Sequence, residues 1–168
     1  LAGQGTEPLP GNFSSHEGVL YAALGYEQGG YNQHHGWILR TLVEHFRFTR
    51  DDEWLRSVAD QLVAAADWIS RERERTLPGG DAAFEGPGAG LLPHGSLEDI
   101  GSWWQWLSTN VYTWRGLDAA GYALNAIDHP AADRISHNAD DLRAALLDAF
   151  NDAMRRSPVV RLRDGTSV

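Results

Sequence analysis

The chain contains no cysteine, no lysine and no long apolar run. Without cysteine, neither a disulfide nor a thiolate metal site can form. No apolar stretch approaches the roughly 20 residues that a membrane-spanning helix needs. All 14 basic residues are arginine and 23 residues are acidic, so the net charge is −9. Nucleic acids and anionic membranes bind positively charged surfaces, and this charge balance argues against either as the main partner.

The motifs of several common enzyme classes are also absent. The chain has no GxxxxGK[ST] phosphate-binding loop, no GxGxxG after a strand, no GxSxG and no HExxH. Nucleotide hydrolysis, dinucleotide-dependent redox chemistry and simple serine or zinc hydrolysis therefore lack their usual signatures. We expect neither a metal nor another cofactor.

The composition that is present is typical of one globular domain. The 168 residues are 42% hydrophobic and 22% charged, which is enough to build a sizeable core. Seven residues are tryptophan, an unusually high number. Such a number indicates either a large helical core or a surface that packs on ring-shaped ligands such as sugars.

Hydrophobic periodicity predicts four long helices and therefore an all-α fold. We expect the helices at about residues 32–48, 52–75, 102–126 and 130–156. Their expected inward-facing residues recur at spacings of three or four: Trp37, Ile38, Thr41, Leu42, His45 and Phe46; Trp54, Leu55, Val58, Leu62, Ala65, Ala66 and Ile69; Trp103, Leu107, Val111, Trp114, Leu117 and Leu124; Ile135, Ala139, Leu142, Leu146 and Ala149. Between the first two helices, Thr49 with Asp52 resembles a capping box, and Asp51 is a second candidate for the cap.

These helices divide the chain into five parts. We expect a loop-rich segment at 1–30, a first helical hairpin at 31–75, a Gly/Pro-rich loop at 76–101, a second hairpin at 102–156 and the start of a following segment at 157–168. A loop as long as the central one is uncommon inside a compact domain unless it has a function.

The two hairpins show an internal repeat. Trp37 and Trp114 lie 77 positions apart, and so do Asp51 and Asp128, and Val58 and Ile135. A hairpin with a wide apolar face becomes stable when it stacks on another, as in helical arrays and toroids. We therefore expect this chain to be a segment of a larger closed ring of hairpins.

The first candidates for chemistry are Glu98 and Asp99, at the end of the Gly/Pro-rich loop. Cleavage of a glycosidic bond needs an acid for the leaving oxygen and a base or nucleophile on the opposite face of the sugar. Adjacent side chains usually point apart, so one of the two carboxylates is expected to face a site. Asp99 is placed to cap a helix that begins near Gly101, which leaves Glu98 as the preferred catalytic candidate.

Two tryptophans follow these carboxylates. Trp103 and Trp104 would point about 100° apart on a helix, so that one packs in the core and the other faces the mouth of a site. An indole face packs on the apolar C–H face of a pyranose, while its N–H group can still donate a hydrogen bond. The alternative is that both only fill a core.

Side chains that bind hydroxyl groups gather at the start of the first helix. Tyr31, Asn32, His34 and His35 lie there, and we interpret them as sugar-binding residues. Asn110 lies 77 positions after Gln33 in the repeat, which predicts a second mouth-facing position.

His94 in the Gly/Pro-rich loop completes the candidates for substrate binding. Adjacent histidines on a helix do not easily bind one ion, because zinc-binding helices place ligands three or four residues apart. His34 or His35 could meet His94 and Glu98 in space, but nothing in the sequence requires a metal.

The stretch YNQHHGWILRTLVEHFRFTRDDEWL, followed by ADWI, resembles the hairpin pattern of six-hairpin glycosidases. These are (α/α)6-toroid enzymes related to glucoamylases and α-L-rhamnosidases. The matching residues are Glu44, His45, Phe46, Thr49, Asp51 or Asp52, Trp54, Leu55, Asp67, Trp68 and Ile69. The later stretch GLLPHG…ED…NVYTWRGLDAA is similar to the passage from a loop into an inner helix in the same superfamily.

The resemblance implies part of a toroid catalytic domain, because a complete toroid has twelve helices. It implies a glycoside hydrolase with a carbohydrate substrate, in which Glu98 is a general acid or accepts a hydrogen bond from a sugar hydroxyl. The second carboxylate and the remaining hairpins would lie outside this sequence. Two alternatives stay open. One is a toroid lyase or sugar epimerase in which His34, His35 or His94 is the base, and the other is a non-catalytic helical repeat that binds a protein.

Overall fold

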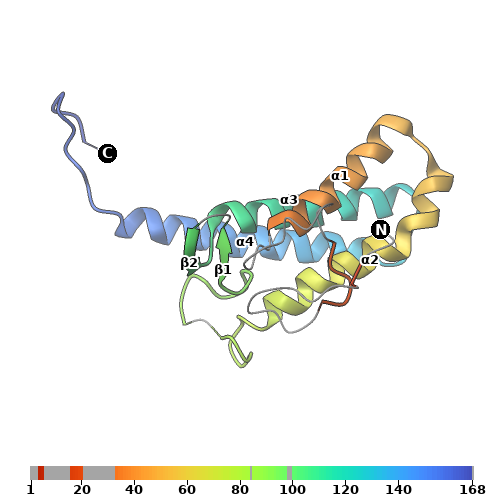
Figure 1. Ribbon diagram of the computed structural model, residues 1–168, viewed down its shortest axis with the longest axis horizontal. Coiled ribbons are helices and arrows are strands. Elements are labelled where there is room, and N and C mark those ends of the chain that lie inside the picture. The colour runs from red at the N-terminus through yellow and green to blue at the C-terminus, as the bar shows by residue number, and fades with distance from the viewer. Residues whose placement is uncertain (1–3, 6–15, 21–32, 84, 98–99, 168) are drawn as a thin grey trace.

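The computed structural model describes residues 4–5, 16–20, 33–83, 85–97 and 100–167 (Figure 1). Within these ranges the chain forms four α-helices and one short two-stranded hairpin, so the predicted all-α class is confirmed. The elements are α1 (Gln33–Thr49), α2 (Asp52–Glu74), β1 (Gly95–Leu97), β2 (Ile100–Trp104), α3 (Leu107–Ala126) and α4 (Ala132–Arg156).

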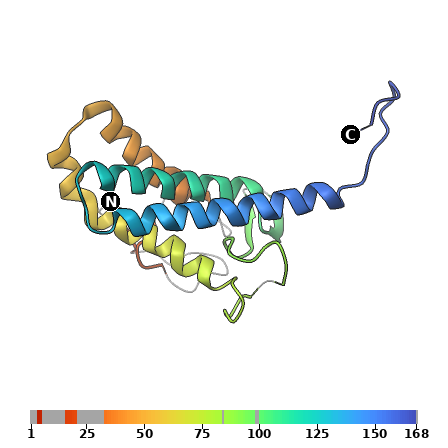
Figure 2. The same cartoon turned by 180° about the vertical axis from the view of Figure 1, so that it is seen from behind.

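Helices α1 and α3 lie side by side and run in the same direction (Figures 1 and 2). Trp37 near the start of α1 stacks on Tyr112, and Arg47 near its end lies over the ring of Tyr122. Helix α4 returns antiparallel along α3, and α2 contacts both α3 and α4. The two helical hairpins are therefore stacked, with α1 and α3 as neighbours.

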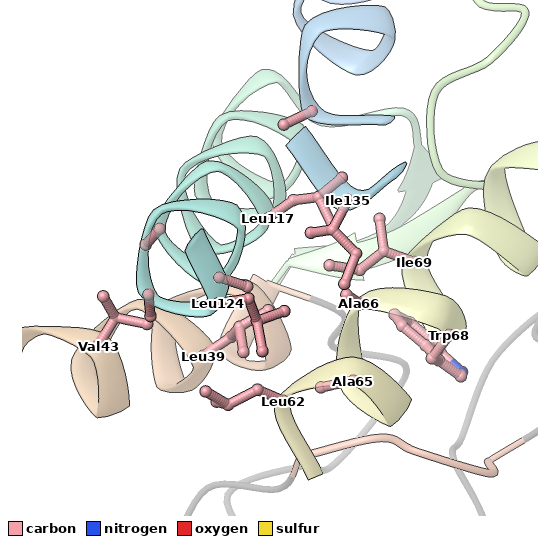
Figure 3. Packing of buried hydrophobic residues seen from close by; sticks show 14 of the residues in the cluster. Leu39, Val43, Leu62, Ala65, Ala66, Trp68, Ile69, Leu117, Leu124 and Ile135 are labelled. Carbon is pink, nitrogen blue, oxygen red and sulfur yellow. The ribbon is translucent and has the colours of Figure 1, made fainter. Parts of the chain in front are cut away.

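All four helices contribute to one hydrophobic core (Figure 3). The apolar stripes predicted for α2 and α4 are confirmed, because Leu62 and Ile69 of α2 and Ile135 and Leu142 of α4 are fully buried. Burying side chains of this size stabilises a fold by roughly 1.5–3 kcal/mol each. Helix α3 adds Leu117 and Leu124, so this core joins both hairpins into a single unit.

The buried face of α1 differs from the predicted one. Phe46 is buried as predicted, but Leu39 and Val43 are buried in addition, whereas Trp37 is 52% exposed. The reason is Gly36, on which a Cβ atom would lie 2.5 Å from the Cα of Thr113 in α3. This close approach turns the glycine face of α1 toward α3. Of the predicted inward residues, Thr41 and His45 are also exposed.

The start of α3 differs as well. The helix begins at Leu107 instead of near residue 102, and the five residues from Ile100 to Trp104 form a strand. Gly and Ser are weak helix formers, while aromatic and β-branched residues favour strands. Trp103 and Leu107, both expected in the core, are 42% and 49% exposed. A cap from Asp99 is also wrong, because the N-cap residue of α3 is Trp106.

The turns between paired helices share one backbone feature. Arg50 and Asp128, one in each turn, both have φ of 55°, in the left-handed region. After the first turn, Asp51 caps α2 by accepting a hydrogen bond from the Trp54 amide at 2.9 Å. The cap is therefore Asp51, while the Thr49 hydroxyl donates back to the carbonyl of His45.

A buried polar network fastens the Gly/Pro-rich loop to the helices. The Arg73 Nε donates to the Gly90 carbonyl at 2.7 Å, and its Nη1 donates to the Asn138 carbonyl at 3.0 Å. The Thr76 hydroxyl accepts from the Gly90 amide at 2.9 Å and lies 2.7 Å from the Leu91 carbonyl oxygen. Burial lowers the pKa of Arg73, and the nearby negative charge of Asp141 opposes that shift. The loop thus has a defined path toward β1.

Candidate functional site

The candidate site is centred on the β1–β2 hairpin, which precedes the N-terminus of α3. The strands pair antiparallel, with Gly95 opposite Trp104 and Leu97 opposite Ile100. The two residues that connect Leu97 to Ile100 are Glu98 and Asp99. The placement of both carboxylates lies outside the described residues. Tyr31 and Asn32, predicted to bind sugar, also lie outside them.

Side-chain hydrogen bonds hold this hairpin and its loop against α3. The Trp106 indole N–H donates to the Gly95 carbonyl at 2.9 Å. The Gln105 amide donates to the carbonyls of Gly88 and Leu92, at 2.9 and 3.1 Å. These bonds cross 11 to 17 positions in the sequence, so they fix the loop relative to the helix that follows it. The start of β1 and the loop that leads to it are therefore anchored on the residues just before α3.

Trp103 and Trp104 are both exposed at the surface of this hairpin. Their exposed fractions are 42% and 59%. They are consecutive residues of a strand instead of a helix, and the pairing of β2 with β1 is irregular between Ile100 and Trp104. An exposed indole offers a large apolar face together with an N–H donor. Strand β2 thus carries two exposed aromatic surfaces for a ligand.

A second aromatic surface joins α1 to α3, and the sequence interpretation missed it. The rings of Trp37 and Tyr112 are stacked, with centroids 5.4 Å apart and planes inclined by 9°. Half of Trp37 remains exposed to solvent. The sequence predicts Trp37 in the core and gives no role to Tyr112. The residue that could have indicated this surface in the sequence is Gly36. Because glycine has no side chain, it lets α1 approach α3 closely, and this approach places Trp37 beside Tyr112.

His35 is a core residue and not a ligand-binding one. Its side chain is buried and packs on the indole of Trp68, with ring centroids 4.5 Å apart. The Nδ1 atom accepts from the Leu20 amide, and Nε2 donates to the Ala65 carbonyl, both at 3.0 Å. Burial lowers the pKa of His35 to about 4, although the bond to Ala65 opposes the shift. The imidazole is therefore neutral at pH 7.

Asn110 is also engaged within the protein, and its predicted role in binding a sugar stays a prediction. It is 1% exposed. Its Oδ1 accepts from the Leu92 amide at 2.9 Å, and its Nδ2 donates to the Trp106 carbonyl at 3.0 Å. Asn110 holds the end of the Gly/Pro-rich loop on α3. Among the other candidates, His34 is half-buried in the first turn of α1, and His94 is half-buried just before β1.

Among the described residues, no three histidine, aspartate or glutamate side chains are grouped so that they could hold an ion. No helix in those ranges is both long and apolar enough to cross a membrane. Comparison of the chain with protein-family models, curated proteins and solved structures finds no match.

Proposed function

We propose that this chain is part of a glycoside hydrolase built from helical hairpins, with its sugar-binding surface at the β1–β2 hairpin. One observation carries the proposal. Two exposed indoles, Trp103 and Trp104, stand on a strand that is joined to its partner by Glu98 and Asp99. Exposed aromatic faces next to carboxylates are the combination that binds a pyranose and cleaves its glycosidic bond.

The stacking of the two hairpins supports the toroid part of the proposal. Helices α1 and α3 are parallel neighbours, and α2 and α4 both lie on one side of them. A ring of hairpins repeats this arrangement, with one layer of parallel inner helices and one layer of outer helices. We propose that the remaining hairpins of such a ring supply the second catalytic carboxylate.

The chemistry follows from the residue types. Glu98 is the proposed general acid, which protonates the glycosidic oxygen as the bond to the leaving group breaks. Asp99 is the less favoured candidate for the same role. The exposed indoles of Trp103 and Trp104 pack on sugar rings of the substrate. The stacked Trp37 and Tyr112 are a further surface for a longer glycan.

A second candidate function rests on a different observation. Leu147, Phe150 and Met154 of α4 are 43%, 43% and 60% exposed, and they share one face of the helix. An exposed apolar face of this kind is typical of a surface that binds another protein. This observation favours the non-catalytic helical repeat. The lyase or epimerase alternative depends on His34 or His94 acting as a base.

Hydrolysis of a glycan panel by the full-length gene product tests the catalytic part of the proposal. Glu98→Gln should lower turnover by about 10²- to 10⁴-fold, the usual contribution of a general acid. The matched control is Glu85→Gln, an exposed glutamate of the same loop, which should leave turnover unchanged. If Glu98→Gln and Glu85→Gln behave alike, the role of Glu98 is refuted.

Sugar binding by this chain tests the other part. Sugars from the panel should change tryptophan fluorescence, and Trp104→Ala should weaken binding by about tenfold or more. Phe48→Ala is the control, because Phe48 is an aromatic residue of α1 that is 87% exposed. A panel in which no sugar changes the fluorescence would exclude the carbohydrate interpretation.

A further inference from the structure

A cavity of about 320 Å³ lies between the start of α3 and the end of α4. It is distinct from the exposed faces of Trp103 and Trp104. Most of its wall is apolar. The residues that line it include Gln105, Trp106, Leu146, Phe150 and Met154.

The polar side chains of the wall are already used inside the protein. The amide nitrogen of Gln105 donates to two loop carbonyls, and the indole N–H of Trp106 donates to a third. Asn110 bonds to the Leu92 amide and to the Trp106 carbonyl. A sugar hydroxyl that entered the cavity would lose its bonds to water and would gain few in return. The cavity therefore suits an apolar group.

The size of the cavity limits that group. Ligand pockets typically measure about 300 to 1,000 Å³, so this one is at the small end of the range. It has room for one aryl ring or a short alkyl chain. Burial of such a group against Leu146, Phe150 and Met154 releases the water that otherwise covers their apolar surface.

The cavity lies beside the end of the proposed sugar-binding strand (Figure 1). Gln105 and Trp106 line it, and they are the two residues that follow Trp104 in the chain. In Figure 1, β2 lies beside the same ends of α3 and α4. A ligand that rests on an indole of β2 can thus extend an apolar substituent into the cavity.

We infer that this cavity is a binding site for an aryl or short alkyl group, and that the substrate is a glycoside or glycan that carries such a group. The apolar site stands on the cavity itself, whereas the link to a sugar rests on the proposed function. The proposal adds a substrate class, because an unsubstituted sugar would leave the cavity empty.

The protein has a built-in probe for this site. Met154 is the only methionine of the chain and lies in the cavity wall. A ¹³C label on the methionine methyl group therefore gives a single NMR signal that reports on the cavity. Benzyl alcohol should shift this signal in a saturable way, whereas an unsubstituted sugar should not. Phenyl glycosides should shift it and bind about tenfold or more tightly than the matching methyl glycosides.

Two matched variants of α4 complete the test. Ala153→Phe fills the cavity from its wall and should abolish the shift by benzyl alcohol and the preference for phenyl glycosides. Ala144→Phe places the same ring at an exposed position of α4 outside the cavity and should change neither. Both alanines are exposed, so both variants should fold.

The outcomes separate this inference from the proposed function. A Met154 signal that benzyl alcohol does not move, or that moves equally in Ala153→Phe, overturns the apolar site even if sugars bind. A shift by benzyl alcohol with no response to any glycoside supports the apolar site and overturns its link to a sugar. A Met154 signal that changes with protein concentration, together with dimers in sedimentation, would instead assign the surface to a second copy of the chain and overturn the inference.

Discussion

Gly36 of α1 and Gly116 of α3 face each other at a close backbone contact between the two hairpins. A Cβ atom on Gly116 would lie 2.9 Å from the Gly36 Cα and still closer to its carbonyl oxygen. Both neighbours are backbone atoms, which cannot rotate away. The two glycines therefore determine how closely α1 and α3 approach, and with it which face of α1 is buried.

The first prediction concerns this contact. Gly116→Ala should lower the free energy of unfolding by about 1–3 kcal/mol, because overpacking outweighs the roughly 1 kcal/mol gained in helix propensity. Urea denaturation measures the change. Gly121→Ala is the control in the same helix, since its Cβ would first meet the Ser136 hydroxyl, which can rotate. A Gly116→Ala protein as stable as the Gly121→Ala protein would contradict the close helix contact.

The second prediction concerns the start of α2. Asp51→Ala should cost about 1 kcal/mol of stability, because the Trp54 amide loses its capping acceptor. Asp52→Ala removes a charge from the first turn of the same helix without removing the cap, and it should cost a few tenths of a kcal/mol. Equal losses in the two variants, measured by thermal denaturation, would show that charge and not the cap stabilises this turn.

The third prediction concerns the buried threonine of the loop. Thr76→Val keeps the shape but leaves the Gly90 amide without its acceptor, which should cost about 1–3 kcal/mol. Hydrogen exchange of the Gly90 and Leu92 amides should also become faster, because the loop is released from α2. Thr41→Val, an exposed threonine of α1, should affect neither quantity. Unchanged exchange in Thr76→Val would mean that the loop is held by other contacts.

The fourth prediction concerns pH. The unfolded chain protonates His35 near pH 6.5, whereas burial lowers the pKa of His35 to about 4 in the folded protein. Between these values the unfolded state binds the extra proton, so stability falls as the pH decreases from 6.5 to about 4. The loss from this residue should reach roughly 3 kcal/mol below pH 4.

A variant pair isolates the contribution of His35. His35→Gln should be less stable at pH 7, because the bonds to Leu20 and Ala65 are disturbed, but its stability should decrease less between pH 6.5 and 4. His137→Gln changes an exposed histidine of α4 and should keep the pH dependence of the wild type. Parallel curves for wild type and His35→Gln would show that His35 is not protonated on unfolding.

The differences between sequence and structure have physical reasons. Periodicity located α2 and α4 because their apolar residues lie on one stripe, as Leu62 and Leu142 illustrate. It failed at residues 100–104, where a strand forms because its partner, the segment from Gly95 to Leu97, comes from an earlier part of the loop. This pairing with the neighbouring segment competes with helix formation, and the spacing of apolar residues does not record it. Asn110 was assigned to the mouth of the site because the repeat does not show which polar side chains anchor a loop.

The sequence by itself determined the helical class, the two hairpins and the position of Glu98 and Asp99 beside a tryptophan-rich segment. These features depend on local spacing and on side-chain chemistry. Only the tertiary structure decided that His35 is buried, that Trp37 and Trp104 are exposed and that a small apolar cavity opens beside β2. Burial and exposure depend on which surfaces meet. Here that choice is made by contacts between distant residues, the approach of Gly36 to Gly116 above all.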